Sequence, residues 1–319
     1  MSQLKFALLN GALSEIRAES AAPNGLRLHR MGHVSGRDDD MEKSWKFAAA
    51  AGDRRQQLLA ELLAADGHEA WVVRDRGDLP ALAGADALIL PLPAADAAGQ
   101  VTPELALEDV LDAQPPGIPV FGGRVPAAAM EAARRRGIGI SDYTRREEFA
   151  ITNALPTAEG ALGLALTEME GTLQGSDCLV LGYGRIGKLL ARRLAALGAR
   201  VTVTARRPAD LAWIRAEGFA ALETERAGEA AGQFDLICST VPAPVLDAAA
   251  ISRVRTGALL LDLVSAPGSM DLEAARCRGI RAEHALSLPA RTAPRAAAAC
   301  VRDCIYQMME EHTCDRTRA

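Results

Sequence analysis

Three glycines near the middle of the chain have the spacing of a phosphate-binding loop. Gly182, Gly184 and Gly187 follow the apolar run Cys178–Leu181 and open an amphipathic segment that Gly198 closes. In dinucleotide-binding domains with this order of strand, glycine turn and helix, the first glycine permits the turn and the second lets backbone approach a pyrophosphate. The third lets the helix pack on the strand, and the helix start offers free N–H groups to the phosphates. The pyrophosphate loop is expected to comprise Gly182, Tyr183, Gly184, Arg185, Ile186 and Gly187.

Two arginines follow the next predicted strand, Val201–Thr204. A carboxylate at that position would accept hydrogen bonds from an adenosine ribose 2′-hydroxyl and repel a 2′-phosphate. The chain instead has Ala205, Arg206 and Arg207, with no Asp or Glu before Asp210. Guanidinium groups match a phosphate bidentately, so the pattern predicts NADP(H) rather than NAD(H). The alternative is a solvated pair of arginines at a strand end.

A further strand, predicted over 234–242, contributes a third group of candidate cofactor-binding residues. It ends in Thr240, Val241 and Pro242, which are expected beside the nicotinamide ribose because the carboxyl ends of parallel strands meet at one edge of a sheet. A plain strand-ending turn is the alternative for these three residues.

Composition limits the class of protein. The chain has 319 residues, 49% hydrophobic and 24% charged, with a net charge of −5, which suits two globular domains and excludes a strongly basic nucleic-acid surface. No apolar run reaches the roughly 20 residues of a membrane span, and the opening LKFALLNGAL lacks a basic start, so a signal peptide is not expected. The six cysteines lack metal-ligand spacing, and we expect reduced thiols, no metal site and a cytoplasmic protein.

Alternation of apolar runs and helical segments predicts an α/β fold of two doubly wound domains with a cleft between them. A flavodoxin-like N-terminal domain has predicted strands ending near Gly52, Arg74, Pro93, Gly123 and Tyr143. Pro156 is expected to open a connector helix that runs to about Glu168. The predicted organisation is a disordered N-terminal extension over 1–44, with Met41 as a candidate start, a flavodoxin-like domain over 45–152, a connector helix over 153–175, an NADP-binding Rossmann domain over 176–290, and a C-terminal helix and tail over 291–319.

Candidate substrate residues lie at the carboxyl ends of strands and on the connector. Guanidinium and amide groups there could hold a carboxylate, although exposed arginines are common. Asp53 and Glu159 are candidate proton acceptors, but helix capping is the favoured interpretation for Asp53, and capping of the connector helix explains Glu159 and Thr157 as well. His68 and His284 have no evident acid partner and are expected to be structural. The candidate substrate residues are Arg54, Arg55, Arg124, Asn153 and Thr157.

The chain resembles the family of dipicolinate synthase A subunits from about Trp45 to Met308. The motifs that carry the resemblance are AGDRRQ, NALPTAEG, LVLGYGRIG, TARR, STVPAPVL and LLDLVSAPG. The resemblance implies that the protein oxidises dihydrodipicolinate to dipicolinate with the flavoprotein-like B subunit of dipicolinate synthase, in the mother cell of a sporulating bacterium. Loss of a hydride and a proton creates an aromatic ring, so the protein mainly has to position the reactants.

The chain departs from that family pattern near its last loop. Where GLPG and APKTAG are expected, it has SLPA (Ser287–Ala290) and APRAAA (Ala293–Ala298), with Arg295 in place of a lysine. The loss of two glycines leaves open a reshaped cleft, with an altered substrate or a subunit that lacks full activity. Two alternative functions stay open as well. One is a 2-hydroxy-acid dehydrogenase, which needs a cleft histidine paired with a carboxylate, and the other is a nucleotide-binding subunit without chemistry. The oligomeric state is also open, a homo-oligomer included.

Overall fold

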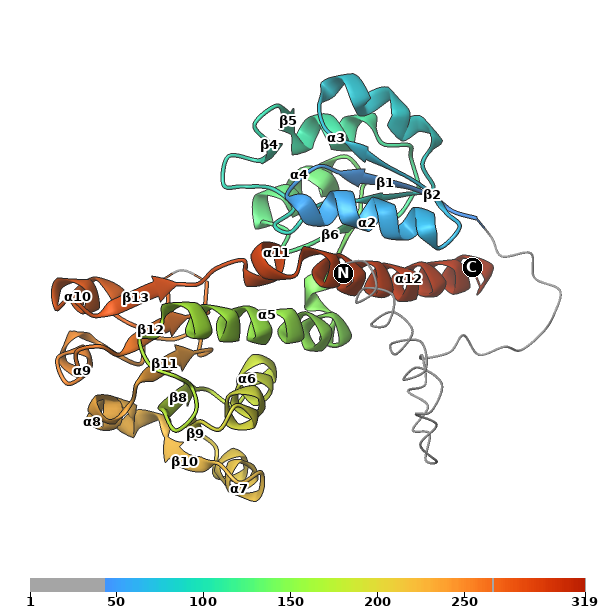
Figure 1. Cartoon of the computed structure of the whole chain (residues 1–319). Coiled ribbons are helices and arrows are strands. Elements are labelled where there is room, and N and C mark those ends of the chain that lie inside the picture. The colour runs from blue at the N-terminus through green and yellow to red at the C-terminus, as the bar shows by residue number, and fades with distance from the viewer. Residues whose placement is uncertain (1–43, 266, 319) are drawn as a thin grey trace, which may run out of the picture. The chain divides into compact units, whose positions relative to one another are not determined.

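The computed structural model describes residues 44–265 and 267–318, and the predicted N-terminal extension falls outside this range except for Ser44. The first sheet has five parallel strands in the order β2-β1-β3-β6-β7 (Figure 1). Numbered along the chain, this is the order 2-1-3-4-5 of flavodoxin-like folds, which confirms the class predicted for the N-terminal domain. We call this sheet, together with the helices that pack on it, the first unit. The strands are β1 (Lys46–Ala50), β2 (Glu69–Val73), β3 (Ala87–Ile89), β6 (Val120–Gly122) and β7 (Ile140–Asp142).

Helices cover both faces of this sheet because successive strand side chains point to opposite sides. Phe47, Ile89 and Phe121 pack with helix α2 (Arg54–Ala65) and helix α12 (Pro294–Arg318), whereas Ala48, Leu88 and Val120 face the other helices. The remaining elements of this unit are η1 (Arg76–Gly84), the antiparallel pair β4 (Gln100–Thr102) and β5 (Leu105–Ala106), α3 (Leu107–Ala113), α4 (Ala127–Arg135) and η2 (Tyr143–Arg145).

The connector helix α5 spans Glu147–Glu168, so the expectation that Pro156 opens it is wrong. The proline lies inside the helix, where its missing N–H removes one backbone hydrogen bond. The helix continues through Pro156 because it is buried on both sides of that residue: Ala154, Ala158 and Ala161 are at most 2% exposed. Thr157 therefore lies in the middle of α5 rather than near a helix start.

The second sheet has six parallel strands in the order β10-β9-β8-β11-β12-β13. This is the order 3-2-1-4-5-6 of the Rossmann fold, as the sequence predicts. Strand β10 was missing from the prediction because its sequence, AALE, contains none of the β-branched or aromatic residues that mark a strand. The strands are β8 (Asp177–Leu181), β9 (Arg200–Ala205), β10 (Ala220–Glu223), β11 (Leu236–Ser239), β12 (Leu259–Asp262) and β13 (Arg281–His284).

This sheet is also covered on both faces. Cys178, Val180 and Val203 pack with α5, α6 and α7, whereas Leu179, Leu181 and Ile237 pack with α8, α9 and α10. Each described helix is too short or too polar to cross a bilayer. The helices are α6 (Arg185–Ala196), α7 (Pro208–Ala216), η3 (Thr224–Arg226), α8 (Ala227–Ala230), η4 (Ala231–Gln233), α9 (Ala248–Ile251), α10 (Leu272–Cys277) and α11 (Leu288–Thr292).

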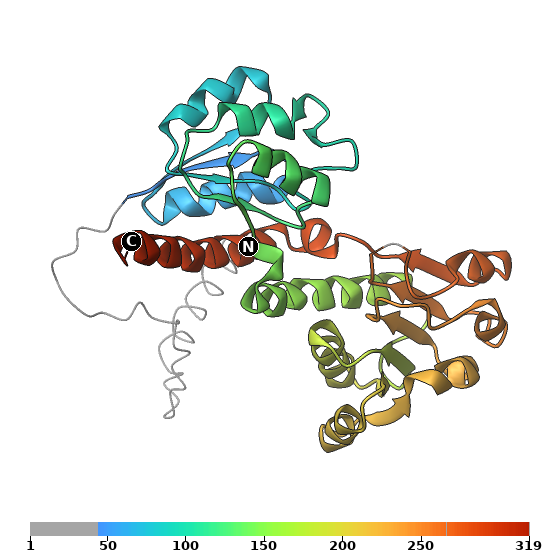
Figure 2. The same cartoon turned by 180° about the vertical axis from the view of Figure 1, so that it is seen from behind.

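The last helix, α12, returns to the first unit. Its buried residues Val301, Ile305 and Met309 join the core that contains Phe47 and Leu59, and α12 lies along α2 (Figures 1 and 2). The sequence left open which domain this helix joins.

Candidate functional site

The glycine loop connects β8 to α6 in the way a dinucleotide site requires. Gly182 has φ +98°, a left-handed conformation, and a Cβ on it would lie 2.7 Å from Thr240 Oγ1. A Cβ on Gly187 would lie 2.1 Å from the carbonyl oxygen of Gly182, so only glycine permits this helix–strand contact. Gly184 precedes α6 and has open space where a Cβ would be. The loop is therefore closed towards the protein and open at the helix N-terminus, where a phosphate binds.

The side chains of the other loop residues differ in their surroundings. Tyr183 is 9% exposed, its ring lies 4.8 Å from Lys188 Nζ, and burial, together with a bond to Glu217, raises its pKa to about 12. Arg185 Nη1 donates to Glu147 Oε2 at 2.9 Å and so ties the first turn of α6 to that of α5. Ile186 is partly buried. The side chains of Tyr183 and Arg185 thus already have partners within the protein.

The two arginines predicted to bind the 2′-phosphate differ in their surroundings. Arg206 is exposed and, among the described residues, has no hydrogen bond or ion pair. Arg207 donates from Nε and Nη2 to the two carboxylate oxygens of Asp210, at 2.7 and 2.9 Å. This pairing lowers the pKa of Asp210 and raises that of Arg207. Ala205 is buried at the end of β9. The guanidinium of Arg206 is thus unpaired among the described residues, whereas Arg207 could contact a phosphate with Nε and Nη2 only if its ion pair with Asp210 broke.

The end of β11 braces the glycine loop. Thr240 Oγ1 donates to the carbonyl oxygen of Leu181 at 2.9 Å, and Val241 Cγ2 would lie 2.9 Å from a Cβ on Gly182. Pro242 is exposed. The Thr240 hydroxyl hydrogen is therefore already used within the protein, and Val241 and Pro242 are the residues that continue towards solvent.

Asp53 and Arg55 form a pair of their own at the start of α2. Asp53 caps the helix by accepting from Arg55 N at 2.9 Å, and its carboxylate binds the Arg55 guanidinium, with Nη2 at 2.6 Å. Burial raises the pKa of Asp53, but the bonds from Arg55 outweigh it and the net pKa is lowered. Arg55 also donates to Leu92 O and is 8% exposed. Asp53 and Arg55 are thus paired with each other, whereas Arg54 is exposed and, within the described chain, unpaired.

Three of the candidate residues lie on α5. Thr157 donates its hydroxyl to Asn153 O at 2.8 Å, a bond within its own helix. Glu159 is exposed and pairs with Arg193 of α6, Nη2 to Oε1 at 3.2 Å, so it does not cap the helix. Asn153 Oδ1 is buried and has no hydrogen-bond partner among the described residues. Asn153 is therefore the one of these three with unused hydrogen-bonding capacity.

Arg124 follows β6 in a left-handed conformation with φ +47°, which is uncommon for a residue other than glycine. Its guanidinium contacts the hydroxyl of Ser265, in the segment after β12. Its backbone N–H donates to Asp142 Oδ1 and to Thr144 Oγ1, both at 3.2 Å. Arg124 therefore extends from the first sheet to a loop of the second.

The DLVSAPG motif folds around a buried carboxylate. Asp262 is fully buried and accepts from Ser269 N at 2.6 Å and from Val264 N at 3.2 Å. Gly268, with φ +92°, brings the chain so close that a Cβ would lie 2.8 Å from Asp262 Oδ2. His284 Nε2 contacts Val264 O, and within the described residues no carboxylate pairs with this histidine. Asp262 and His284 thus shape the loop that carries Ser265.

In the SLPA segment, where the chain departs from the family pattern, one residue has an uncommon backbone conformation. Ser287, at the position where a glycine is expected, has φ +55° and lies at the start of α11 without a side-chain cap. In this conformation the Cβ of serine lies close to the following carbonyl oxygen, which causes steric strain that glycine, without a Cβ, would avoid. Ser287 thus adopts a backbone conformation that glycine reaches with less strain.

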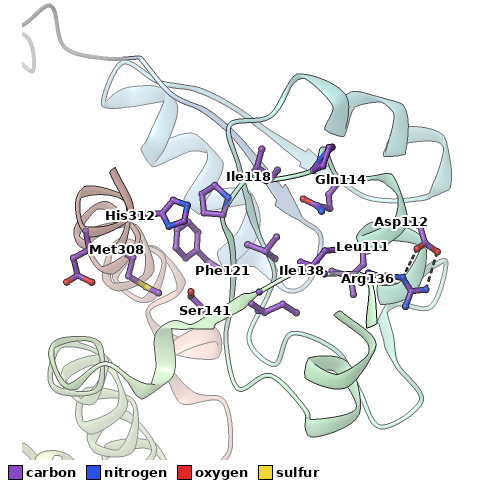
Figure 3. Close-up of a pocket in the computed structure, with 18 of the residues that line it drawn as sticks. Leu111, Asp112, Gln114, Ile118, Phe121, Arg136, Ile138, Ser141, Met308 and His312 are labelled. Carbon is purple, nitrogen blue, oxygen red and sulfur yellow. Dashed lines mark hydrogen bonds and ion pairs between the residues drawn. The ribbon is translucent and has the colours of Figure 1, made fainter. Parts of the chain in front are cut away.

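An open cavity of about 820 Å³ lies at a different place from all these residues. Its lining includes Ile118, Ile138 and Phe121 near the amino ends of β6 and β7, and His312 at the end of α12 (Figure 3). Because Arg124 follows the carboxyl end of β6, the cavity opens at the opposite edge of the sheet. Arg136, at its rim, is neutralised by Asp112 and Glu108. The cavity is therefore not part of the candidate dinucleotide site.

Comparison with known proteins identifies the class first. Residues 136–264 match the family model for the D-isomer specific 2-hydroxyacid dehydrogenase NAD-binding domain. With the sheet order and the glycine loop, this match defines an α/β oxidoreductase-type protein with a nicotinamide-dinucleotide-binding Rossmann domain.

More specific matches identify the family. The A subunit of Bacillus subtilis dipicolinate synthase is 33% identical over 232 residues, 71% of this chain and 78% of that protein. The crystal structure of the B. subtilis dipicolinate synthase A chain has a TM-score of 0.76 at 30% identity and covers 86% of this chain and 98% of its own. That of the A subunit from Bacillus halodurans has a TM-score of 0.74 at 27% identity, over 83% and 98%. The chain belongs to the family of dipicolinate synthase A subunits.

Two residues near the site, Asp142 and Thr144, were missing from the sequence prediction. They lie in SDYTR, interpreted there only as the end of a short strand. An Asp at the end of a strand is a common start of an Asx turn, in which its side chain accepts from the backbone N–H two residues on, and Thr144 N does donate to Asp142 Oδ1 at 2.9 Å. Asp142 could have indicated that turn, but not the contact with Arg124, which lies 18 residues earlier.

Proposed function

We propose that this chain is the NADP-dependent A subunit of a dipicolinate synthase. It oxidises dihydrodipicolinate to dipicolinate, acting with the enzyme's flavoprotein-like B subunit in the mother-cell cytoplasm of a sporulating bacterium. A nicotinamide held at this site would take up the hydride that the substrate loses, and the proton would pass to solvent. Support comes from membership of the A-subunit family and from the nicotinamide-dinucleotide-binding domain.

The observation that carries the choice of cofactor is the unpaired guanidinium of Arg206. It immediately follows the end of β9, where NAD-specific sites place a carboxylate, and it is exposed. An arginine that is unpaired within the described chain gives a 2′-phosphate a charge-assisted partner without the cost of breaking another ion pair. The open shell around Gly184 and the left-handed turn at Gly182 also fit a bound pyrophosphate.

The substrate's two carboxylates need donors on the protein. Arg54 and Arg124 follow β1 and β6 at the same edge of the first sheet, and Asn153 has a buried amide oxygen without a partner among the described residues. We assign carboxylate binding to the two arginines and orientation to Asn153, and we assign no residue as acid or base. Val241 and Pro242 stand beside the nicotinamide ribose in this proposal, and the α6 N-terminus holds the phosphates.

A coupled assay tests the proposal. The purified protein, a candidate B subunit encoded nearby and dihydrodipicolinate are mixed with NADP⁺ or NAD⁺, and ultraviolet absorbance follows both the pyridine product and reduced nicotinamide. We expect both to appear together and faster with NADP⁺. An equal rate with NAD⁺ would contradict the cofactor assignment, and cofactor binding without turnover would favour a non-catalytic subunit.

The same assay separates the 2-hydroxy-acid alternative, which the family model over 136–264 favours. Turnover of 2-hydroxy acids in the absence of the B subunit would support that alternative. The geometry of His284 speaks against it, because this histidine contacts a backbone carbonyl rather than a carboxylate.

A further inference from the structure

The segment after β6 is fixed more tightly than an exposed loop requires. Gly123 N donates to Pro91 O at 3.1 Å, and Gly123 O accepts from Ala94 N at 2.7 Å. A Cβ on Gly123 would lie 2.5 Å from the hydroxyl oxygen of the buried Tyr143. The backbone that leads into Arg124 therefore has very little freedom.

Two side chains from the next strand end hold Arg124 itself. Asp142 accepts from Arg124 N with Oδ1 and from Val125 N with Oδ2, both at 3.2 Å, and its side chain is only 9% exposed. Thr144 Oγ1 accepts from Arg124 N at 3.2 Å and donates to Asp142 Oδ1 at 2.6 Å. These bonds satisfy the backbone N–H groups of Arg124 and Val125, and they hold Arg124 in a left-handed conformation that is otherwise unfavourable.

The fixed backbone conformation of Arg124 determines the position of its guanidinium group. Arg124 is exposed, and its Nη2 contacts the hydroxyl of Ser265, a neutral group in the loop shaped by Asp262. No carboxylate among the described residues pairs with Arg124. A neutral hydroxyl is a weaker partner for a guanidinium than a carboxylate, so an incoming carboxylate can replace it.

We propose that Asp142 and Thr144 are positioning residues that fix Arg124 in its left-handed conformation so that its guanidinium binds one carboxylate of the substrate. This inference rests on the proposed function and adds to it the part of the protein that makes the carboxylate site rigid. A glycine at position 124 would remove the strain, yet the chain has an arginine there. The strain is thus retained for the side chain.

Arg124→Gly tests whether backbone strain at position 124 is retained for the sake of the guanidinium. The substitution relieves the backbone while deleting the guanidinium, so the thermal midpoint should stay equal or rise by about 2–4 °C. Binding of dipicolinate, the stable pyridine product, to the NADP⁺-loaded protein should weaken by about 10–100-fold in calorimetric titration. A fall in the midpoint would contradict the assigned strain.

Thr144→Val and Thr144→Ser test the positioning role. Valine keeps the shape but removes the hydroxyl, and serine keeps the hydroxyl. We expect Thr144→Val and Asp142→Asn to weaken dipicolinate binding several-fold with NADPH affinity unchanged, and Thr144→Ser to bind as the wild type does. Asp75→Asn is a matched control, because Asp75 also accepts a backbone N–H, from Gly77 at 2.7 Å, but at another turn of the first unit.

A double variant separates positioning from general structural damage. If Thr144 acts through Arg124, adding Thr144→Val to Arg124→Gly should weaken dipicolinate binding no further. An additive loss, or wild-type affinity in both Thr144→Val and Asp142→Asn, would overturn the inference while leaving the proposed function intact. A wild-type protein that binds NADPH but not dipicolinate would overturn the proposed substrate, and the inference with it.

Discussion

At the scale of single residues, two glycines of the phosphate loop have different steric surroundings. A Cβ on Gly187 would meet backbone at 2.1 Å, whereas Gly184 has nothing within 4 Å and ordinary dihedral angles of φ −85° and ψ −165°. We therefore expect Gly187→Ala to lower both the thermal midpoint and NADPH affinity. Gly184→Ala should leave the midpoint unchanged and weaken NADPH by at least about tenfold, because only the bound pyrophosphate needs that space. Full NADPH affinity in Gly184→Ala, measured by fluorescence titration, would contradict this.

Cofactor preference should depend on three neighbouring charges. Arg206→Ala is expected to weaken NADPH by about 10–100-fold with little effect on NADH, since one charge-assisted contact is lost. Asp210→Asn should do the opposite and strengthen NADPH binding several-fold, because it frees Arg207, whose side chain is 79% exposed. Titration with 2′,5′-ADP isolates the effect of the phosphate. Unchanged 2′,5′-ADP affinity in both variants would show that the phosphate binds elsewhere.

Ser287 offers a test of backbone strain. Ser287→Gly should stabilise the protein by about 1 kcal/mol, because φ +55° costs an L-residue roughly that much and no side-chain bond is lost. Ser287→Ala is the control, since it removes the hydroxyl but keeps the Cβ, and it should not stabilise. Urea unfolding measures both variants. Equal stability of the glycine and alanine variants would argue against a strained backbone at this turn.

At the scale of elements, the start of α2 should make stability depend on pH. The pKa of Asp53 lies below its ordinary value of 3.8 in the folded protein, so its contribution is fully present above 3.8 and disappears as pH falls through the lowered value. Asp53→Ala should cost about 1 kcal/mol near neutral pH and progressively less in acid. Asp53→Asn keeps a capping oxygen and should cost less. A deficit of Asp53→Ala that is independent of pH would contradict the assignment.

The elements were more predictable than the partners of their side chains. Apolar runs such as Cys178–Leu181 locate the strands because burial on both faces of a parallel sheet requires them. Pro156 misled the prediction of α5, since tertiary burial outweighed the local cost of a proline. The Arg207–Asp210 pair was readable from its spacing of three residues. The left-handed Arg124 was not, because nothing in an arginine signals positive φ.

At the scale of the whole molecule, the chain crosses between its two sheets twice. Helix α5 leads from the first sheet to the second and packs against both α6 and α12. Helix α12 follows the second sheet in sequence but contributes Val301, Ile305 and Met309 to the core beside α2. The first unit is therefore incomplete until the C-terminal residues are present, which explains why sequence position alone could not assign the last helix.

This arrangement predicts that a change in the last helix damages the first unit and spares the cofactor site. Ile305 is fully buried against the first core, so Ile305→Ala should cost about 2–5 kcal/mol. Gln307→Ala, on the exposed side of the same helix, should cost less than about 0.5 kcal/mol. Hydrogen exchange should show faster opening of β1 and α2 in Ile305→Ala, with β8 and the start of α6 still protected on addition of NADPH. Equal loss of protection in both sheets would mean that the two units unfold as one.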